Sequence, residues 1–312
     1  MNKEHPSWLG RFWAVVRYEM LWNIRKKMFL GALLFAFVFA TLNLALPGYF
    51  GLSENPYFVI TFSAGNLTFI LFAIVTGMHS ISGEYEKGTV VPLLTKPVSR
   101  TMVFLGKLFA IFLVILVTYT VLFTYTIIGS IIVYGPQNSL YLAPLSLIGD
   151  VISTFIWVSV VLAAGAISKN SLIAILTAFG LFIALVLGGG IIGQLSDNPQ
   201  ALNYIPGTGA TGTLNIIGGE NITIGNISIN TLSAVATGTD SIGNNLIKAV
   251  LYPNSEVGFY HQNIFNLTAP ARLLYTEPIG LIALRSIGVA VLYTAVFLFV
   301  AWFAFKRWQI LE

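Results

Sequence analysis

The 312-residue chain contains no cysteine and three scattered histidines, and only 9% of its residues are charged. Without cysteine, a disulfide framework and thiolate metal sites are excluded. His5, His79 and His261 have no metal-ligand spacing, so we expect no metal site. Soluble domains carry about 25% charged residues. The low charge, together with 56% hydrophobic residues, indicates a helical protein with several membrane spans.

The sequence also lacks the common motifs of catalysis. It has no G-x-x-x-x-G-K-[ST] phosphate loop, so this chain is not expected to hydrolyse ATP itself. No Ser/His/Asp arrangement, pair of catalytic acids or zinc motif stands out. We therefore expect neither an enzyme nor a cofactor bound by this chain, and nothing indicates a nucleic-acid partner.

Six long apolar runs are the main structural signal. A helix crosses the roughly 30 Å hydrocarbon core with about 20 apolar residues, and transmembrane barrel strands give no uninterrupted runs of this kind. The six runs cover residues 28–46, 56–78, 103–133, 145–167, 172–192 and 279–305. We therefore predict an all-α polytopic membrane protein with six transmembrane helices, of which the first five lie within 28–192.

Basic residues predict the orientation of these spans, because cytoplasmic loops are enriched in lysine and arginine. The loops 47–55 and 134–144 contain neither residue type. With six spans, one side of the membrane receives Lys3, Arg11, Arg17, Arg25, Lys26, Lys27, Lys87, Lys96, Arg100, Lys107, Lys169, Lys306 and Arg307. Both termini, including the tail 306–312, are therefore predicted to lie in the cytoplasm, with the chain in the plasma membrane.

Residues 1–27 are predicted to form a cytoplasmic interfacial helix that contacts membrane lipids. Within 7–25, the apolar residues share one half of a helical projection and three arginines lie on the other half. The apolar half contains Trp8, Leu9, Phe12, Trp13, Val16, Met20 and Ile24. Glu19 and Trp22 break the pattern. The alternative is a plain basic flank that precedes the first span.

The segment 193–278 is predicted to be a small, partly β external domain between the fifth and sixth spans. It is rich in Gly, Asn, Thr and Ser, with turn signals between short β-branched runs. We expect strands at 213–217, 221–224 and 227–230 and a helix at 244–251. Glycosylation sequons begin at Asn221, Asn226 and Asn266. Because glycans attach to exposed loops on the translocated side, the sequons agree with the predicted topology.

Two charged residues fall inside the predicted spans. Asp150 and Arg285 lie at similar depths from the outer ends of the fourth and sixth spans. Charges in hydrocarbon are costly and usually find a partner, so we predict that the two form an intramembrane pair near the outer leaflet. The alternative is that each side chain reaches the headgroups separately.

A polar segment interrupts the apolar sequence at 80–107 and reads SISGEYEKGTVVPLLTKPVSRTMVFLGK. Composition alone allows an ordinary polar loop. Its prolines bracket a short apolar stretch, which predicts a short helix across the cytoplasmic face, with its acids available to a soluble partner. Ser99 or Thr101 is a candidate cap for the helix of the third span.

This segment resembles the signature loop of the permeases of type-two ATP-binding-cassette (ABC) exporters. The pattern E-x-E-x-G-T-x-x-x-L-L-x-x-P-V-S-R-x-x-x-x-x-G-K is formed by Glu84, Glu86, Gly88, Thr89, Leu93, Leu94, Pro97, Val98, Ser99, Arg100, Gly106 and Lys107. Six spans, an amphipathic N-terminal helix and a tight turn at 168–171 also match the family plan. The resemblance covers about 1–192 and 279–312.

The resemblance implies that the loop after the second span, here 79–102, holds a coupling helix that docks on a separate ATPase. Residues 83–95 are the expected helix, and Arg100 and Lys107 are expected at the lipid headgroups. The implied ATPase-coupling residues are Glu84, Glu86, Gly88, Thr89, Pro97 and Arg100. Two permeases, as a homodimer or a heterodimer, and two ABC ATPase copies make such a unit, with ATP and magnesium held by the ATPases.

In such permeases, the translocation path runs between the two permeases, along spans two and five. The polar candidates for lining it are Ser63, Asn66, Thr68, Thr76 and Thr177. This weakly polar, uncharged set suits export of an amphipathic or hydrophobic cargo, such as a drug, a lipid or a peptide-like molecule, better than export of an ion.

The long segment before the sixth span departs from the family, whose members commonly have short re-entrant helices there. Residues 270–282 are the expected re-entrant element, and the glycine-rich insert is additional. Two alternatives stay open: a secondary transporter or channel with a helix break at 188–190, and a membrane anchor that acts through its external domain. Abundant isoleucine, the absence of cysteine and the sequons are compatible with an archaeal cell surface.

Overall fold

The computed structural model describes residues 7–49, 56–86, 99–195, 199–214, 222–224, 227–229, 234–261 and 272–307. Within these residues, six helices are long and apolar enough to cross a membrane. A small antiparallel sheet is formed between the fifth and sixth of them. This arrangement confirms the predicted fold class.

Local sequence signals set several helix ends. The Met102 N–H donates to the Ser99 hydroxyl at 3.1 Å and so caps α7, and Gly135, with a φ of 80°, ends the same helix. The helices are α1 (Trp8–Ile24), α2 (Lys27–Tyr49), α3 (Phe58–Thr61), α4 (Asn66–Gly77), α5 (Ser82–Glu86), α7 (Arg100–Tyr134), α8 (Ala143–Ser168), α9 (Ser171–Leu195), α10 (Ile242–Leu251) and α11 (Ile279–Arg307). Short 3-10 helices are η1 (Leu140–Leu142) and η2 (Pro199–Tyr204).

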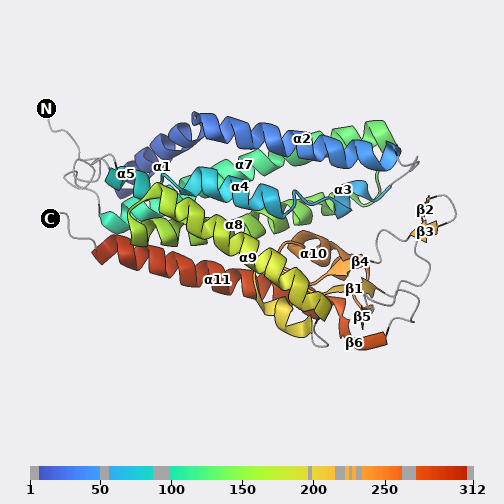
Figure 1. The fold of residues 1–312 in the computed structure, drawn as a ribbon. Helices are drawn as coiled ribbons and strands as arrows, with labels where there is room; N and C mark the ends of the chain where they lie inside the picture. Colours follow the sequence, from blue (N-terminus) through green and yellow to red (C-terminus); the bar gives the residue numbers. More distant parts are fainter. Residues whose placement is uncertain are drawn as a thin grey trace, which may run out of the picture.

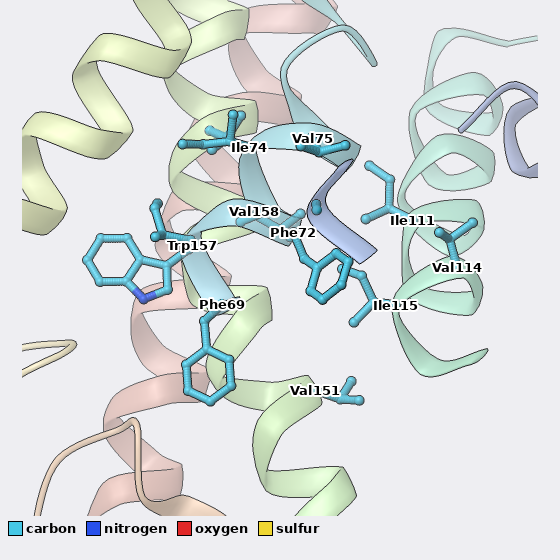
Figure 2. Close-up of a cluster of buried hydrophobic side chains, with 14 of the residues drawn as sticks. Phe69, Phe72, Ile74, Val75, Ile111, Val114, Ile115, Val151, Trp157 and Val158 are labelled. Atoms are coloured by element: carbon cyan, nitrogen blue, oxygen red, sulfur yellow. The ribbon is translucent and has the colours of Figure 1, made fainter. Parts of the chain in front are cut away.

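Helix α4 lies inside the bundle, in contact with α2, α7, α8 and α9. Figure 2 shows Phe69 and Phe72 of α4 among side chains of α7 and α8, which contribute Ile115 and Trp157. All four side chains are fully buried. Because lipid is as apolar as this core, close van der Waals packing holds such helices together more than exclusion of water does.

The two ends of the bundle carry different structures (Figure 1). Helices α1 and α5 and the C-terminal end of α11 lie at one end, and the sheet and α10 lie at the other. Helix α1 packs along the start of α7. A Cβ at Gly106 would lie 2.8 Å from Val15 Cγ1, so a glycine at this position lets α1 approach α7 closely.

The second span is broken, whereas the sequence predicted a continuous helix over 56–78. Helix α3 ends at Thr61, Phe62 is extended, and α4 begins only at Asn66. Gly65 has a φ of 79°, a conformation that glycine adopts without strain. The sequence at the break, Phe62-Ser63-Ala64-Gly65-Asn66, is more polar than the rest of the span, and the groups that bond to the Ala64 N–H and the Phe62 carbonyl come from α8.

The insert between α9 and α11 contains a sheet with the strand order β4-β1-β5-β6, all antiparallel. Its strands are β1 (Thr211–Leu214), β4 (Ala234–Ala236), β5 (Glu256–His261) and β6 (Arg272–Pro278), and β2 (Ile222–Ile224) pairs separately with β3 (Ile227–Ile229). The three predicted strands and the helix are present within a few residues. The strands β4, β5 and β6 were not predicted.

Helix α10 of the insert lies against the transmembrane helices α8 and α11. A Cβ at Gly149 on α8 would overlap the backbone of Gly243, so the two helices touch backbone to backbone. Ile242 packs with Ile156 and Ala290 on the other side. The prediction of a re-entrant element at 270–282 was wrong, because Arg272–Pro278 forms β6. Small residues on α8 instead let α10 pack among the spans.

Candidate functional site

Three charged residues form a buried cluster where α5 meets α1 and α7. Lys107 Nζ lies 2.5 Å from Glu19 Oε1 and 2.7 Å from Glu84 Oε1. The side chains of Lys107 and Glu19 are 3% and 5% exposed, and that of Glu84 is 15% exposed. Buried charges are tolerated when paired in good geometry. The cluster therefore fixes three elements to one another, and the loss of its central cation would leave two carboxylates unbalanced.

This arrangement corrects the predicted place of Lys107. It does not extend to the headgroups, because the close approach of α1 at Gly106 covers it and supplies Glu19 as a partner. The same contact explains why Glu19 breaks the amphipathic pattern of α1. Arg100, the other predicted headgroup residue, donates from Nη1 to the Lys306 carbonyl at 3.0 Å and so joins the start of α7 to the end of α11.

Glu86, the last residue of α5, binds the first residue of α9. The Ser171 N–H donates to Glu86 Oε1 at 2.6 Å, and the Ser171 hydroxyl donates to Oε2 at 3.0 Å. Ser82 Oγ and His79 Nδ1 also lie 3.0 Å from Ser171 Oγ. A carboxylate is favoured at this position, because the N-terminus of a helix carries partial positive charge. Ser171 therefore joins the end of the second span to the start of the fifth.

The contacts of Glu84 and Glu86 differ from those predicted. Both acids were expected to face a soluble partner, yet each binds a transmembrane helix of its own chain, since Lys107 and the start of α9 offer buried positive groups. Gly88, Thr89 and Pro97 lie outside the described residues. The Glu84–Lys107 ion pair joins α5, which precedes the loop 87–98, to α7, which follows it.

A second polar site surrounds the break in the second span. Asp150 on α8 accepts hydrogen bonds from the Ala64 N–H at 2.9 Å and from the Ser63 hydroxyl at 3.1 Å. The Ser146 hydroxyl donates to the Phe62 carbonyl at 2.9 Å. These bonds satisfy backbone groups that an intact helix would satisfy internally, which is required at membrane depth.

Residues of the insert also donate or accept hydrogen bonds at the same break. Asn66 Nδ2 donates to Asp240 Oδ2 at 2.9 Å, and Asn244 Nδ2 donates to the Thr61 carbonyl at 3.2 Å. The Ser153 hydroxyl of α8 donates to the Thr239 carbonyl at 2.5 Å. Burial raises the pKa of the Asp240 carboxyl above its ordinary value. Residues 239–244 of the insert thus bond directly to the broken second span and to α8.

The predicted pair of Asp150 and Arg285 is not formed. Arg285 instead makes a bidentate pair with Glu277, at 2.9 Å from Nη1 to Oε1 and 2.8 Å from Nη2 to Oε2. Tyr204 covers its guanidinium, with Cζ 5.7 Å from the ring centroid. Glu277 is the second-last residue of β6, which leads directly into α11, so this carboxylate lies close to Arg285 in the chain, while Asp150 bonds to the break in the second span.

The predicted path-lining residues have different environments. Thr177 is exposed on α9, whereas Thr76 is fully buried and donates to the Phe72 carbonyl within α4. Ser63 and Asn66 are partly buried and hold the break through their contacts with Asp150 and Asp240. Thr68 is buried as well, so of the five predicted side chains Thr177 alone is exposed.

Several residues of these sites were not identified from the sequence as partners: Glu19, Ser171, Asp240 and Asn244. A usable signal existed for Glu19, whose charge interrupts an apolar helix face, and for Lys107, which lies within an apolar run. The sequons Asn221, Asn226 and Asn266 lie outside the described residues. Within the described ranges, no group of three His, Cys, Asp or Glu residues could hold a metal ion.

Comparisons with known proteins agree with this architecture. The model of a family described as "ABC-2 family transporter protein" matches residues 13–309. Over 158 residues, the chain is 30% identical to "Probable ABC transporter permease YtrC" of Bacillus subtilis (strain 168). That alignment covers 46% of this chain and 48% of the relative, so the chain spans about half the length of the curated relative it matches. The chain therefore belongs to the ABC-2 transporter family, and its six long apolar helices are those expected of a multi-pass membrane protein.

Proposed function

We propose that this permease exports an amphipathic or hydrophobic molecule, driven by ATP hydrolysis in a separate subunit that docks on the loop 87–98. The main support is the anchoring of this loop. Helix α5, which precedes the loop, binds α7 through the Glu84–Lys107 pair and α9 through Glu86, and Lys107 in turn binds Glu19 of α1. Movement of α5, which directly precedes the loop, would therefore act on α7 and α9 through these contacts.

In this proposal, the end of the bundle that carries α5 is cytoplasmic. The basic residues of α1, the turn after α8 and the last turn of α11, which holds Lys306 and Arg307, belong to this end. The insert then faces the exterior, where the three sequons would be available for glycosylation. The positive-inside rule favours this orientation over its reverse.

The transport unit consists of two permeases and two ATPases, which hold ATP and magnesium. The exposed surface of α9 supports a translocation path that runs along this helix, between the two permeases. This surface is apolar, with Thr177 as a polar group among residues such as Leu176, Phe179 and Ile183. A lining of this kind favours a drug, a lipid or a peptide-like molecule over an ion, because an ion requires polar groups to replace its hydration.

The orientation is tested by labelling single cysteines, since the chain has no native cysteine. Asn254→Cys in an exposed turn of the insert should react with a membrane-impermeant maleimide in intact cells. Lys27→Cys at the start of α2, which is also exposed, should react only after permeabilisation. The reverse pattern would overturn the orientation.

Purification from native membranes in a mild detergent tests the ATPase dependence. Mass spectrometry should identify a co-purifying subunit with a phosphate-loop motif, and the purified complex should hydrolyse ATP. If no such subunit is present even after crosslinking in the membrane, the chain acts without an ATPase, and the proposal is wrong.

A further inference from the structure

The contact between Glu86 and Ser171 links the loop 87–98 to the fifth span. We propose that this contact transmits nucleotide-driven movement of the loop to α9, which makes both residues positioning residues for transport. The inference rests on the proposed function, in which an ATPase docks on this loop. It assigns to Glu86 a task inside the permease instead of a contact with the ATPase.

The geometry favours the transmission of movement, because a direct contact links the residue before the loop to α9. Glu86 directly precedes the loop and ends α5. Both of its carboxylate oxygens accept hydrogen bonds from Ser171, which is the first residue of α9. Hydrogen bonds to a charged acceptor are roughly twice as strong as neutral ones. A shift of α5 therefore acts on the very start of α9.

Ser171 also receives support from the first residue of α5 and from the turn just before that helix. Ser82 Oγ and His79 Nδ1 each lie 3.0 Å from the Ser171 hydroxyl. A Cβ at Gly165 would lie 3.4 Å from Ser82 Oγ and 3.5 Å from the Ala174 Cβ, so α5, α8 and α9 are in close contact here. The α5–α9 junction thus moves as a unit, and not as one isolated hydrogen bond.

Helix α9 is suited to respond to such a shift. The apolar part of α9 is 22% buried within the chain, compared with 72% for the span that contains α8. Gly180, Gly188 and Gly190 have no other group within 4 Å of an added Cβ. A helix with few packed neighbours can change its position at lower cost than a central one. Movement at Ser171 would thereby displace the surface that carries Thr177.

A purely local role as a helix cap is the competing explanation, and the chain offers a matched control for it. Asn170 Oδ1 accepts a hydrogen bond from the Ile173 N–H at 3.1 Å and caps the same helix. Asn170→Ala removes this cap but retains the Glu86 contact. Ser171→Pro does the opposite: it removes both donors to Glu86, while proline is well tolerated in the first position of a helix.

The test uses the complex of the full chain with its ATPase, purified from native membranes and placed in lipid nanodiscs. Spin labels at Leu187→Cys on α9 and Ile132→Cys on α7 occupy exposed positions, and no native cysteine competes for them. Their distance is measured by pulsed electron spin resonance with and without ATP and vanadate. ATP hydrolysis is recorded in parallel.

The wild-type complex should show a nucleotide-dependent change in this distance. Glu86→Ala and Ser171→Pro should each lose the change while the ATPase remains bound and hydrolyses ATP. Asn170→Ala should retain it, as should Glu86→Gln, which can still bond to Ser171. If the distance still changes in both Glu86→Ala and Ser171→Pro, this inference is wrong, but the proposed function is unaffected. A wild-type complex without an ATPase would overturn the proposed function, and the inference with it.

Discussion

Asn66, at the start of α4, donates a hydrogen bond of 2.9 Å to Asp240, which lies 174 positions later in the insert. The bond joins the broken second span to a segment that the sequence presented as a separate external domain. Together with the Asn244 contact to the Thr61 carbonyl, it holds the insert at the helix break. Substitutions at the break in the second span are therefore expected to alter the stability of the insert, and substitutions in the insert to alter that of the break.

Removing this bond should loosen the insert. Asp240→Ala leaves the Asn66 amide without its acceptor and should destabilise the segment 234–251 by about 1.5–3 kcal/mol, the usual value of a hydrogen bond to a charged group. Hydrogen exchange followed by mass spectrometry should show faster exchange in this segment. Asn254→Ala, in an exposed turn of the same insert, should leave the exchange unchanged. Equal exchange in Asp240→Ala and wild type would show that the bond contributes nothing.

Lys248 on α10 should make the stability of the insert depend on pH. Burial lowers the pKa of its ammonium group to about 8 from 10.5, although the group donates to the Ala234 carbonyl. Between these two values, the unfolded state binds more protons than the folded state, so the free energy of unfolding should rise as the pH increases from about 8 to 10.5.

Thermal unfolding of wild type and Lys248→Met, recorded between pH 7 and 9.5, measures this effect. The difference in melting temperature between the two proteins should change with pH in favour of the wild type as the lysine loses its proton. A difference that is constant over this range would mean that the lysine titrates at its ordinary pKa in the folded protein.

The buried cluster around Lys107 should be sensitive to the loss of its cation. Lys107→Met leaves Glu19 and Glu84 without their counter-charge and should cost about 3–5 kcal/mol, which is typical of a broken buried ion pair. Thermal unfolding in detergent should show a large fall in the melting temperature. Lys27→Met, at an exposed lysine on α2, should have little effect.

Neutralising the whole cluster provides a second check on this explanation. The combined variant Glu19→Gln, Lys107→Met and Glu84→Gln contains no unbalanced charge, so it should recover most of the lost stability. If it is as unstable as Lys107→Met alone, the loss comes from packing of the lysine side chain and not from electrostatics.

The contact of α8 with α10 should not tolerate even one added methyl group. Gly149→Ala places a Cβ into the backbone of Gly243, and the forced separation should cost about 1–3 kcal/mol. Gly288→Ala on α11 makes the same change where nothing lies within 4 Å, and it should be neutral or stabilising. If the Gly149→Ala variant has the same melting temperature as the Gly288→Ala variant, α10 is not packed against α8.

The sequence predicted the long spans well because their signal is local. An apolar run of about 20 residues has few alternatives to a membrane helix. The break at Phe62–Gly65 has only the weak local signal of Ser63, Gly65 and Asn66, and its partner Asp150 is 86 residues away from Ala64. The strands β4, β5 and β6 were missed for a similar reason, since their pairing joins segments that are distant in the sequence.

The partners of Glu84, Glu86 and Arg285 were not predicted from the sequence. Glu84 and Glu86 lie in a polar segment, which favoured a soluble partner. Their actual partners depend on the crossing of α1 over α7 at Gly106 and on the position of Ser171 at the start of α9. Arg285 was paired with Asp150 because the two residues were predicted at similar depths in the membrane. Its actual partner, Glu277, depends on the path of the chain through β6, which was not predicted.

Crosslinking from the loop 87–98 tests the central claim most directly. Thr89→Cys in this loop and Asn254→Cys in the insert each provide a single reactive cysteine, because the chain has none of its own. Native membranes are treated with a bifunctional cysteine-to-lysine crosslinker, and the products are identified by mass spectrometry. The account predicts a product between Thr89→Cys and a subunit with a phosphate loop, and no such product from Asn254→Cys. An ATPase captured equally from both positions, or from Asn254→Cys alone, would contradict it.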